Sequence, residues 1–467
     1  MFQYDALTTR DDPNNVLGDL PVYLRPEDGQ TSPNPLPLLG SHPTFSLRKL
    51  ALELSPPALV GEFHPESPWL GITRLRPSIK WPQATYNPDD ICTRFRKSVA
   101  TSIGDASTIA VLASGGLDST AILLHAAVQC QAEGRRLLAI VADMVDDRGV
   151  SSSSVMQTLV RNLKIPCEVY VVEGQTPGQE TLQPIWDPHG PRGDALPHLG
   201  MAISDCAANL GAEVLLSGSG ADEVLGSGRY LFASLLREGR LDAALSYLRD
   251  LTHEGGKRRI ATETLALLAR VLPTPLAMHL YWATNWFELC NVSPANVLAK
   301  PYREIVEQWS AEWIKQIITF HVEFHQRDWA KADAWDAIFP ADRLSSLGSV
   351  PKKYPYLDPD FVTYAMALPL ASRYAAHLST MYHRSKALVL RLYPCDTHKV
   401  LPQQKQIFAD TFDAYMRGLE KPERCLTLGL IDPEALAQCQ DSVLLLKIAA
   451  IEEWIKGAEK IGAKAVA

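Results

Sequence analysis

The stretch that decides the fold runs from residue 109 to residue 120 and reads IAVLASGGLDST. Its first five residues form an apolar run typical of a strand buried on both faces, and the amphipathic run AILLHAAVQ at 121–129 predicts a helix. Between them, Gly115 and Gly116 permit a turn whose backbone N–H groups point inward, toward the place at which the helix N-terminus also points. Strand, loop and helix together predict a phosphate-binding site.

This loop differs from the common nucleotide-binding motifs. The GxxxxGK[ST] spacing with its lysine is missing, and so is GxGxxG. Asp118 lies in the predicted first turn of the helix, where a carboxylate facing phosphates is tolerated only with a cation between them. The loop therefore predicts Mg²⁺ and a second carboxylate nearby.

Three further apolar runs follow, and they predict the rest of a parallel sheet. They are LLAIVAD (137–143), CEVYVVEG (167–174) and AEVLLSG (212–218). A helix-like stretch precedes the first of them, and another lies between the first and the second. This alternation predicts an α/β fold with a doubly wound parallel sheet, whose ligand site lies at the carboxyl ends of the strands. From about residue 231 the pattern is helical. Ile305, Trp309, Trp313, Ile317 and Phe320 recur at helical spacing, and 443–457 predicts a closing helix.

The end of the last apolar run carries the expected second carboxylate. Ser217, Gly218, Ser219 and Gly220 are small enough for close backbone approach, and Asp222 follows them. Because strand ends can be neighbours in a doubly wound sheet, Asp118 and Asp222 are expected around one magnesium–pyrophosphate group.

These two segments resemble a known family. SGGLDST followed by SGSGADEVLGS is similar to the synthetase domain of asparagine synthetases, β-lactam synthetases and lasso-peptide macrolactam cyclases, all of the PP-loop ATP pyrophosphatase group. The segment Tyr354–Asp358 resembles the family's PFLD segment, and Lys405 in QQKQIF resembles its late lysine. The resemblance covers roughly residues 85 to 460 and implies formation of an acyl-adenylate from ATP, then amide formation.

The resemblance also implies roles for individual residues. Ser114, Gly115, Gly116, Asp118 and Ser119 would hold the pyrophosphate and Mg²⁺, with Asp222 as the second metal ligand. Leu112, Ser217 and Gly218 would line the ATP pocket, and Lys405 would neutralise charge that develops on the α-phosphate. Ser219 stands where asparagine synthetases have Glu and β-lactam synthetases have Tyr. Because an ordinary hydroxyl is a poor base, the catalytic base stays unassigned.

Other positions depart from the family. Members with a working glutaminase half have cysteine directly after the initiator Met, whereas residue 2 here is Phe2 and the first cysteine is Cys92. We therefore expect 1–84 to be an irregular N-terminal arm and the remnant of a glutaminase-like domain, and 85–467 to be the synthetase domain. The attacking amine would come from the substrate or from another protein. The basic sequence PKK at 351–353 predicts an altered acceptor pocket.

Macrolactam formation on a peptide fits these departures best, because the peptide supplies both carboxylate and amine. The alternatives are an asparagine synthetase-like enzyme that uses free ammonia, a β-lactam-type synthetase on a small substrate, and a nucleotide-binding subunit without turnover. Retention of Asp118, Asp222 and Lys405 argues against the last. A peptide substrate would also predict a leader peptidase and a leader-binding protein as partners.

Composition excludes several other classes. The 467 residues are 46% hydrophobic and carry a net charge of −8 without a Lys/Arg-rich run, so no nucleic acid is expected as a partner. The eight cysteines lie far apart without a CxxC pair, which argues against a metal ribbon, a disulfide framework and a tRNA sulfur-transfer enzyme. The apolar stretches fall short of the roughly 18 residues that span a bilayer. We therefore expect a cytoplasmic protein without a membrane span.

Overall fold

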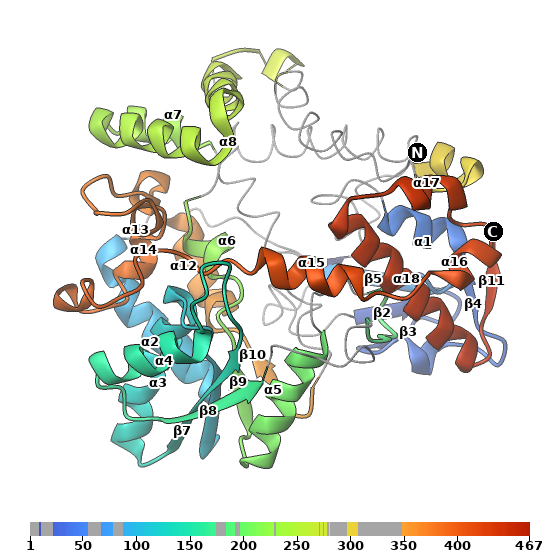
Figure 1. The fold of residues 1–467 in the computed structure, drawn as a ribbon, viewed down its shortest axis with the longest axis horizontal. Coiled ribbons are helices and arrows are strands. Elements are labelled where there is room, and N and C mark those ends of the chain that lie inside the picture. Colours follow the sequence, from blue (N-terminus) through green and yellow to red (C-terminus); the bar gives the residue numbers. More distant parts are fainter. Residues whose placement is uncertain are drawn as a thin grey trace.

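The computed structural model describes residues 9–10, 22–54, 67–77, 87–173, 184–191, 197–227, 230–269, 271–273, 275–277, 280, 297–306 and 348–467. A five-stranded sheet in which every pairing is parallel organises its α/β part (Figure 1). In spatial order its strands are β10 (Lys352–Lys353), β9 (Val214–Leu216), β6 (Thr108–Leu112), β7 (Arg136–Asp143) and β8 (Glu168–Glu173). Each of the four apolar runs thus forms a strand, and the predicted α/β class is confirmed.

Helices cover both faces of this sheet, because alternate residues of each strand point to opposite sides. Ile109 and Val111 of β6 pack into the largest buried cluster, whereas Ala110 and Leu138 pack on the other face. The helices on the first face include α2 (Ile91–Ile103), α3 (Leu117–Glu133), α4 (Ser152–Asn162), α6 (Ala221–Leu225), α12 (Pro359–Ala367) and α14 (Ala387–Leu390). The opposite face is covered by α5 (Pro197–Asn209). The sheet is therefore doubly wound, as predicted.

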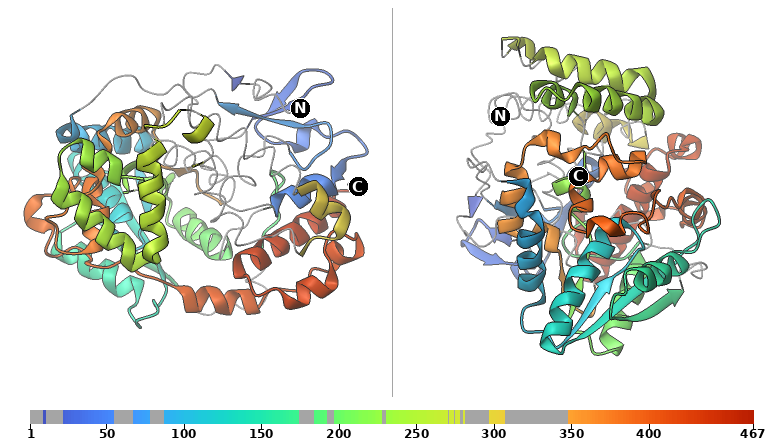
Figure 2. Two further views of the ribbon diagram at one scale, coloured as in Figure 1. Left: turned by 90° about the horizontal axis from the view of Figure 1, so that it is seen from above. Right: turned by 90° about the vertical axis from the view of Figure 1, so that its left-hand side faces the viewer.

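A second buried core joins segments from both ends of the chain. Phe45 and Trp69 pack their rings against Trp454, with centroids 5.3 and 4.8 Å away. Strand β4 (Thr44–Ser46) pairs in parallel with β11 (Lys464–Val466) beside this core. The helices that contribute to it include α1 (Leu47–Glu53), α16 (Glu423–Thr427) and α18 (Ser442–Lys460), the last matching the predicted closing helix. Figures 1 and 2 show these blue and red segments side by side.

A small sheet lies within residues 1–84, the segment predicted to be an irregular arm and the remnant of a glutaminase-like domain. Strands β2 (Val22–Arg25) and β3 (Gln30–Ser32) form a hairpin, and β2 also pairs antiparallel with β5 (Thr73–Pro77). Strand β1 (Thr9–Arg10) pairs in parallel with β5. Residues 26–29 form the turn of the hairpin, and Arg25 closes it through a hydrogen bond of 3.0 Å to Asp28. Strand β5 thus joins β1 and the hairpin into one sheet, although it lies more than 40 residues further along the chain.

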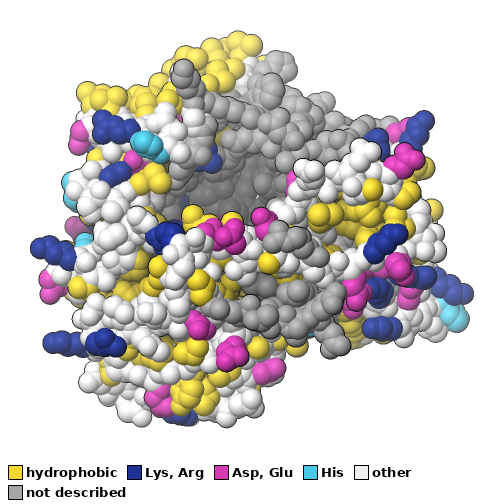
Figure 3. All heavy atoms as spheres, in the orientation of Figure 1, with side chains coloured by type: hydrophobic (Ala, Val, Ile, Leu, Met, Phe, Trp, Pro, Cys, Tyr) yellow, Lys and Arg dark blue, Asp and Glu magenta, His cyan; other side chains and the backbone are white. Residues whose placement is uncertain are grey.

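The remaining helices follow the predicted helical character of the C-terminal portion. Helices α7 (Phe232–Arg237) and α8 (Leu241–Ala269) form a pair with its own buried cluster, and hydrophobic side chains gather over this upper edge of the face in Figure 3. Ile305 lies in a helix at 300–306, whereas 309–320 lie outside the described residues. The others are α13 (Met381–Ser385), α15 (Ala409–Arg417) and α17 (Pro433–Gln438). Among the helices of the described residues, none combines the length and apolar character that crossing a membrane requires.

Candidate active site

The loop between β6 and α3 is braced by its own serines. Oγ of Ser119 accepts a hydrogen bond from the backbone N–H of Ser114 at 3.1 Å and lies 3.0 Å from Oγ of Ser114. Gly115 has a φ of +77°, a left-handed conformation that glycine adopts without steric cost. Val155 of α4 lies so close that a Cβ on Gly115 would meet it at 3.1 Å. The loop is therefore built for close backbone approach, as its sequence predicts.

The second loop lies directly against the first. Strand β9 is the hydrogen-bonded neighbour of β6, so their carboxyl ends lie side by side. A Cβ on Gly218 would lie 3.1 Å from the backbone nitrogen of Ser119, which makes glycine the residue that lets the two loops touch. Ser217 donates its backbone N–H to the carbonyl oxygen of Lys353 in β10 at 2.9 Å. The predicted neighbouring of the two strand ends is confirmed, and the PKK segment lies at this same edge.

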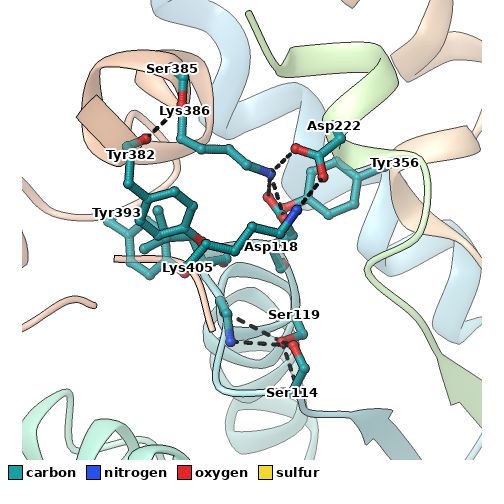
Figure 4. A network of polar contacts seen from close by, with 12 residues as sticks. Ser114, Asp118, Ser119, Asp222, Tyr356, Tyr382, Ser385, Lys386, Tyr393 and Lys405 are labelled. Atoms are coloured by element: carbon teal, nitrogen blue, oxygen red, sulfur yellow. Dashed lines mark hydrogen bonds and ion pairs between the residues drawn. The ribbon is translucent and has the colours of Figure 1, made fainter. Parts of the chain in front are cut away.

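Asp118 and Asp222 converge, as predicted, but the group between them is the ammonium of Lys386 (Figure 4). Nζ of Lys386 lies 2.7 and 2.6 Å from the two carboxylate oxygens of Asp118 and 2.6 Å from Oδ1 of Asp222. The side chain of Lys386 is 5% exposed, that of Asp118 23% and that of Asp222 54%. One nearly buried cation thus compensates two carboxylates.

Burial and opposite charge compete in setting the pKa values of this cluster. Burial disfavours the charged form of Lys386, but the two carboxylates outweigh it and raise the pKa of the ammonium. Burial also opposes the charge on Asp222, but Lys386 and Lys405 outweigh it and lower the pKa of that carboxyl. At Asp118 burial prevails and the pKa is raised, as it is for Glu223 in α6. At Asp118 the cost of burying the charge therefore exceeds the stabilisation that Lys386 provides.

Lys386 is a residue that the sequence analysis missed. It lies at the joint between α13 and α14 and is 4% exposed as a whole residue. The available signal was its place directly before the apolar run ALVL at 387–390, which predicts burial. Because a buried lysine needs anionic partners, this pattern indicates an ion pair with carboxylates such as Asp118 and Asp222.

Two tyrosines hold the first turn of α3. Oη of Tyr356 donates a hydrogen bond to the carbonyl oxygen of Asp118 at 3.0 Å, and Oη of Tyr393 donates to that of Leu117. Burial raises the pKa of both tyrosines well above the ordinary value, so both hydroxyls stay protonated donors. Tyr356 belongs to the YPYLD segment that resembles PFLD. This segment therefore holds the start of α3 in place, directly after the loop.

A cavity of about 630 Å³ opens beside the loop between β6 and α3. Its walls combine the loop, α4 and the segment 400–408. The lining residues include Ser114, Gly115, Gly116, Asp118, Arg148, Val155, Thr158, Tyr382, Pro402, Gln404, Lys405 and Phe408. The volume lies in the range of small-molecule sites, which is roughly 300–1,000 Å³. The loop between β6 and α3 thus faces a cavity large enough for a nucleotide.

Lys405 reaches the same cluster from the opposite wall of the cavity. Its Nζ lies 3.6 Å from Oδ2 of Asp222, and its side chain is 67% exposed. Two lysines, one buried and one exposed, therefore face the place where the phosphate loop would hold anions. This position is compatible with the predicted role of Lys405 toward the α-phosphate.

The remaining predicted residues lie at the same strand ends. Leu112 is the last residue of β6 and is partly buried on the α5 face of the sheet. Oγ of Ser219 lies 3.1 Å from Oγ of Ser217, and among the described contacts no carboxylate hydrogen-bonds it. The structure thus brings the predicted residues together and adds Lys386, while their chemical roles stay predictions.

The donor set fits Mg²⁺ only when phosphates share it. Within the part of the chain that the structure describes, no group of three or more His, Cys, Asp or Glu side chains is arranged to hold a metal. Mg²⁺ is commonly bound by one or two protein carboxylates together with water and substrate phosphates. Asp118 and Asp222 supply this number of carboxylates, and the ammonium between them shows that the position accommodates positive charge.

A comparison with protein families matches most of the chain. A family model described as asparagine synthase matches residues 91–414, a range that includes both loops, Lys386 and Lys405. Among solved structures, the U34-tRNA thiolase NcsA from Methanococcus maripaludis, with its 4Fe-4S cluster, is similar at 13% identity over 58% of this chain and 85% of that chain. Its TM-score of 0.24 is too low to support any inference. No curated protein matches the sequence significantly.

Proposed function

This chain belongs to the asparagine synthase family, and from that premise we propose that it forms amide bonds through an acyl-adenylate, with release of AMP and pyrophosphate. Family membership itself supports an ATP-dependent amide ligase. The finer proposal concerns the way in which ATP is used and the substrate that is joined.

The proposal rests on one observation: two carboxylates and two lysines converge at the N-terminus of α3, directly after the 114–116 loop. Asp118 and Asp222 share the ammonium of Lys386, and Lys405 lies 3.6 Å from Asp222. Transfer of an adenylyl group requires mainly that charged oxygens be positioned and neutralised, because little covalent chemistry falls to the protein. A preorganised set of fixed charges at a phosphate loop suits this requirement.

The proposed reaction has two displacements. A substrate carboxylate oxygen forms a bond to the α-phosphorus while the bond from that phosphorus to the bridging oxygen of pyrophosphate breaks. A substrate amine then attacks the acyl carbon, the bond to AMP breaks, and the amine loses a proton as the amide forms. Bound Mg²⁺ would neutralise charge on the leaving phosphates.

The residues of this chain position the reactants. Asp118 and Asp222 would hold Mg²⁺, and the backbone of the 114–116 loop would hold the pyrophosphate. Lys386 would keep the aspartates oriented, and Lys405 would face the α-phosphate. Holding carboxylate, amine and nucleotide in one cavity supplies effective concentration that solution does not.

A peptide that supplies both carboxylate and amine is the substrate that we propose, with a macrolactam as product. Ser219 contacts the hydroxyl of Ser217 at 3.1 Å, and among the described contacts it has no acidic partner that would make it a base. A small substrate that is a poor nucleophile would need a base to deprotonate it, and Ser219 without an acidic partner is not such a base. This argues against a small-substrate synthetase. A peptide route would further involve a leader peptidase and a leader-binding protein.

Isotope transfer tests the mechanism directly. The protein is incubated with ATP, Mg²⁺ and a panel of peptides and amino acids whose carboxylates carry ¹⁸O, with and without added amine. We expect AMP that contains one ¹⁸O, detected by mass spectrometry, and a peptide product lighter by one water. ADP as product, or AMP without ¹⁸O, would refute the acyl-adenylate. Product formed only with added amine would support a small-substrate enzyme instead.

A further inference from the structure

The loop that follows β7, residues 146–150, is hydrogen-bonded to the segment that carries Lys405. The backbone N–H of Asp147 donates to the carbonyl oxygen of Ile407 at 2.9 Å. In return, the carboxylate of Asp147 accepts from the backbone N–H groups of Ala409 and Asp410, both at 3.2 Å. Asp147 therefore binds the chain directly after Lys405 through three hydrogen bonds.

These bonds supply a cap that α15 lacks within its own sequence. The residue at its N-cap is Phe408, whose side chain accepts no hydrogen bond. The first N–H groups of a helix have no partner inside the helix, and a carboxylate near them is favoured by the helix dipole. Asp147 provides this cap from another part of the fold. At its other end, α15 packs on α18 through Tyr415, Met416 and Leu446, so α15 extends between the two parts of the molecule (Figure 1).

The same loop holds the other side of Lys405 through Arg148. The guanidinium of Arg148 hydrogen-bonds Oε1 of Gln404. It is itself fixed by Oδ2 of Asp146, which accepts from Nε and Nη2 at 3.1 and 2.6 Å. The side chain of Asp146 is 0% exposed. On the far side of Lys405, Nε2 of Gln406 donates to the carbonyl oxygen of Val150 at 3.3 Å.

Lys405 needs such support, because its own contact is weak. Its side chain is 67% exposed, and its ion pair with Asp222 spans 3.6 Å. Exposed pairs of this kind contribute about 0–1 kcal/mol and do not fix a side chain. Both immediate neighbours of Lys405 in the chain are instead held by the 146–150 loop.

We propose that Asp147 and Arg148 are positioning residues that hold Lys405 beside the phosphate loop. The proposal rests on the proposed function, because it takes Lys405 as a group that acts on the nucleotide. Whether Asp147 and Arg148 hold the 402–410 segment in place can, however, be measured without turnover.

The test compares Asp147→Ala with a matched control, Asp432→Ala. Asp432 caps α17 with the same chemistry, accepting from the backbone N–H groups of Glu434 and Ala435 at 2.9 and 3.0 Å. Both variants therefore lose one carboxylate and two backbone contacts. Hydrogen exchange of the peptide covering 402–410, the melting temperature, and kcat and KM for ATP are measured for each full-length protein.

In Asp147→Ala we expect the rate of amide exchange in the 402–410 peptide to rise about tenfold or more. Without the contacts of Asp147, the backbone hydrogen bonds of this segment open more often by local unfolding. We expect kcat to fall by about 10- to 100-fold while KM for ATP changes by less than about threefold, because misplacement of a catalytic group by about 1 Å costs that much. Asp147→Asn keeps one accepting oxygen and should restore most of kcat. Asp432→Ala should lower the melting temperature similarly and leave kcat unchanged.

Unchanged exchange at 402–410 in Asp147→Ala would overturn the proposal whatever the activity. Faster exchange with an unchanged kcat would overturn it as well, because the cap would then serve stability alone. If the wild-type protein itself forms no AMP, the proposed function fails, and the exchange measurement still decides whether the 146–150 loop positions the segment.

Discussion

Replacing Lys386 by methionine removes one ammonium and keeps an unbranched side chain of similar length. The ammonium makes contacts of 2.7 and 2.6 Å with Asp118 and of 2.6 Å with Asp222. Removing one partner of a buried ion pair costs about 3–5 kcal/mol, because the other charge stays buried without compensation. Asp118 is 23% exposed and belongs near the lower end of that range. Asp222 is 54% exposed and adds less than about 1 kcal/mol. We therefore expect the free energy of unfolding to fall by about 3–4 kcal/mol.

The assay is urea unfolding at neutral pH without divalent cations, followed by tryptophan fluorescence and by circular dichroism. Lys97→Met is the matched control, because Lys97 pairs with Asp360 at a comparable 3.0 Å while both side chains are at least 70% exposed. That control should lose less than about 1 kcal/mol. The comparison separates the effect of burial from the effect of losing an ion pair.

A double variant tests the cause. In Lys386→Met with Asp118→Asn, the neutral amide no longer leaves a buried charge, so more than half of the lost stability should return. The coupling between two contacting positions is commonly about 0.5–3 kcal/mol. Equal losses in Lys386→Met and Lys97→Met, or no recovery in the double variant, would refute the account of Lys386 as the compensating charge.

The remaining predictions concern the site, the second core and the dependence on pH. Asp222→Ala should abolish pyrophosphate formation while the circular dichroism spectrum stays unchanged, and wild-type turnover in this variant would contradict the site. Gly457→Ala should cost about 1–3 kcal/mol by overpacking, because a Cβ there would lie 2.0 Å from the ring of Trp186; an unchanged melting temperature would show that the core yields freely. At Asp250, burial opposes the charge but Arg384 outweighs it and lowers the pKa of the carboxyl. The stability that this carboxyl contributes is therefore present above its unfolded pKa of about 3.9 and is lost as pH falls through its lower folded pKa. Asp250→Asn should flatten the fall in unfolding free energy across that acid range, and an identical pH profile would count against the ion pair.

The sheet and its two loops could be predicted from the sequence because their signals are local. A strand buried on both faces needs a continuous apolar run, and the runs at 109–113, 137–143 and 212–218 each meet that need. A close approach between backbone segments needs glycine, and Gly115 and Gly218 therefore predict where the backbone is approached closely. The adjacency of Asp118 and Asp222 followed because parallel strands end at one edge of a sheet.

The sequence by itself therefore determined the α/β class, the glycine-containing loop between β6 and α3, and the two facing aspartates. The tertiary structure alone decided that Lys386 lies between them, that segments near both ends of the chain share a core around Trp454, and that Asp147 caps α15. These features join residues that are far apart in the chain, and each partner alone has the local pattern of an ordinary lysine, tryptophan or aspartate. The physical reason is that burial and charge compensation depend on which surfaces meet in space, whereas strand and loop formation depend on neighbours along the chain.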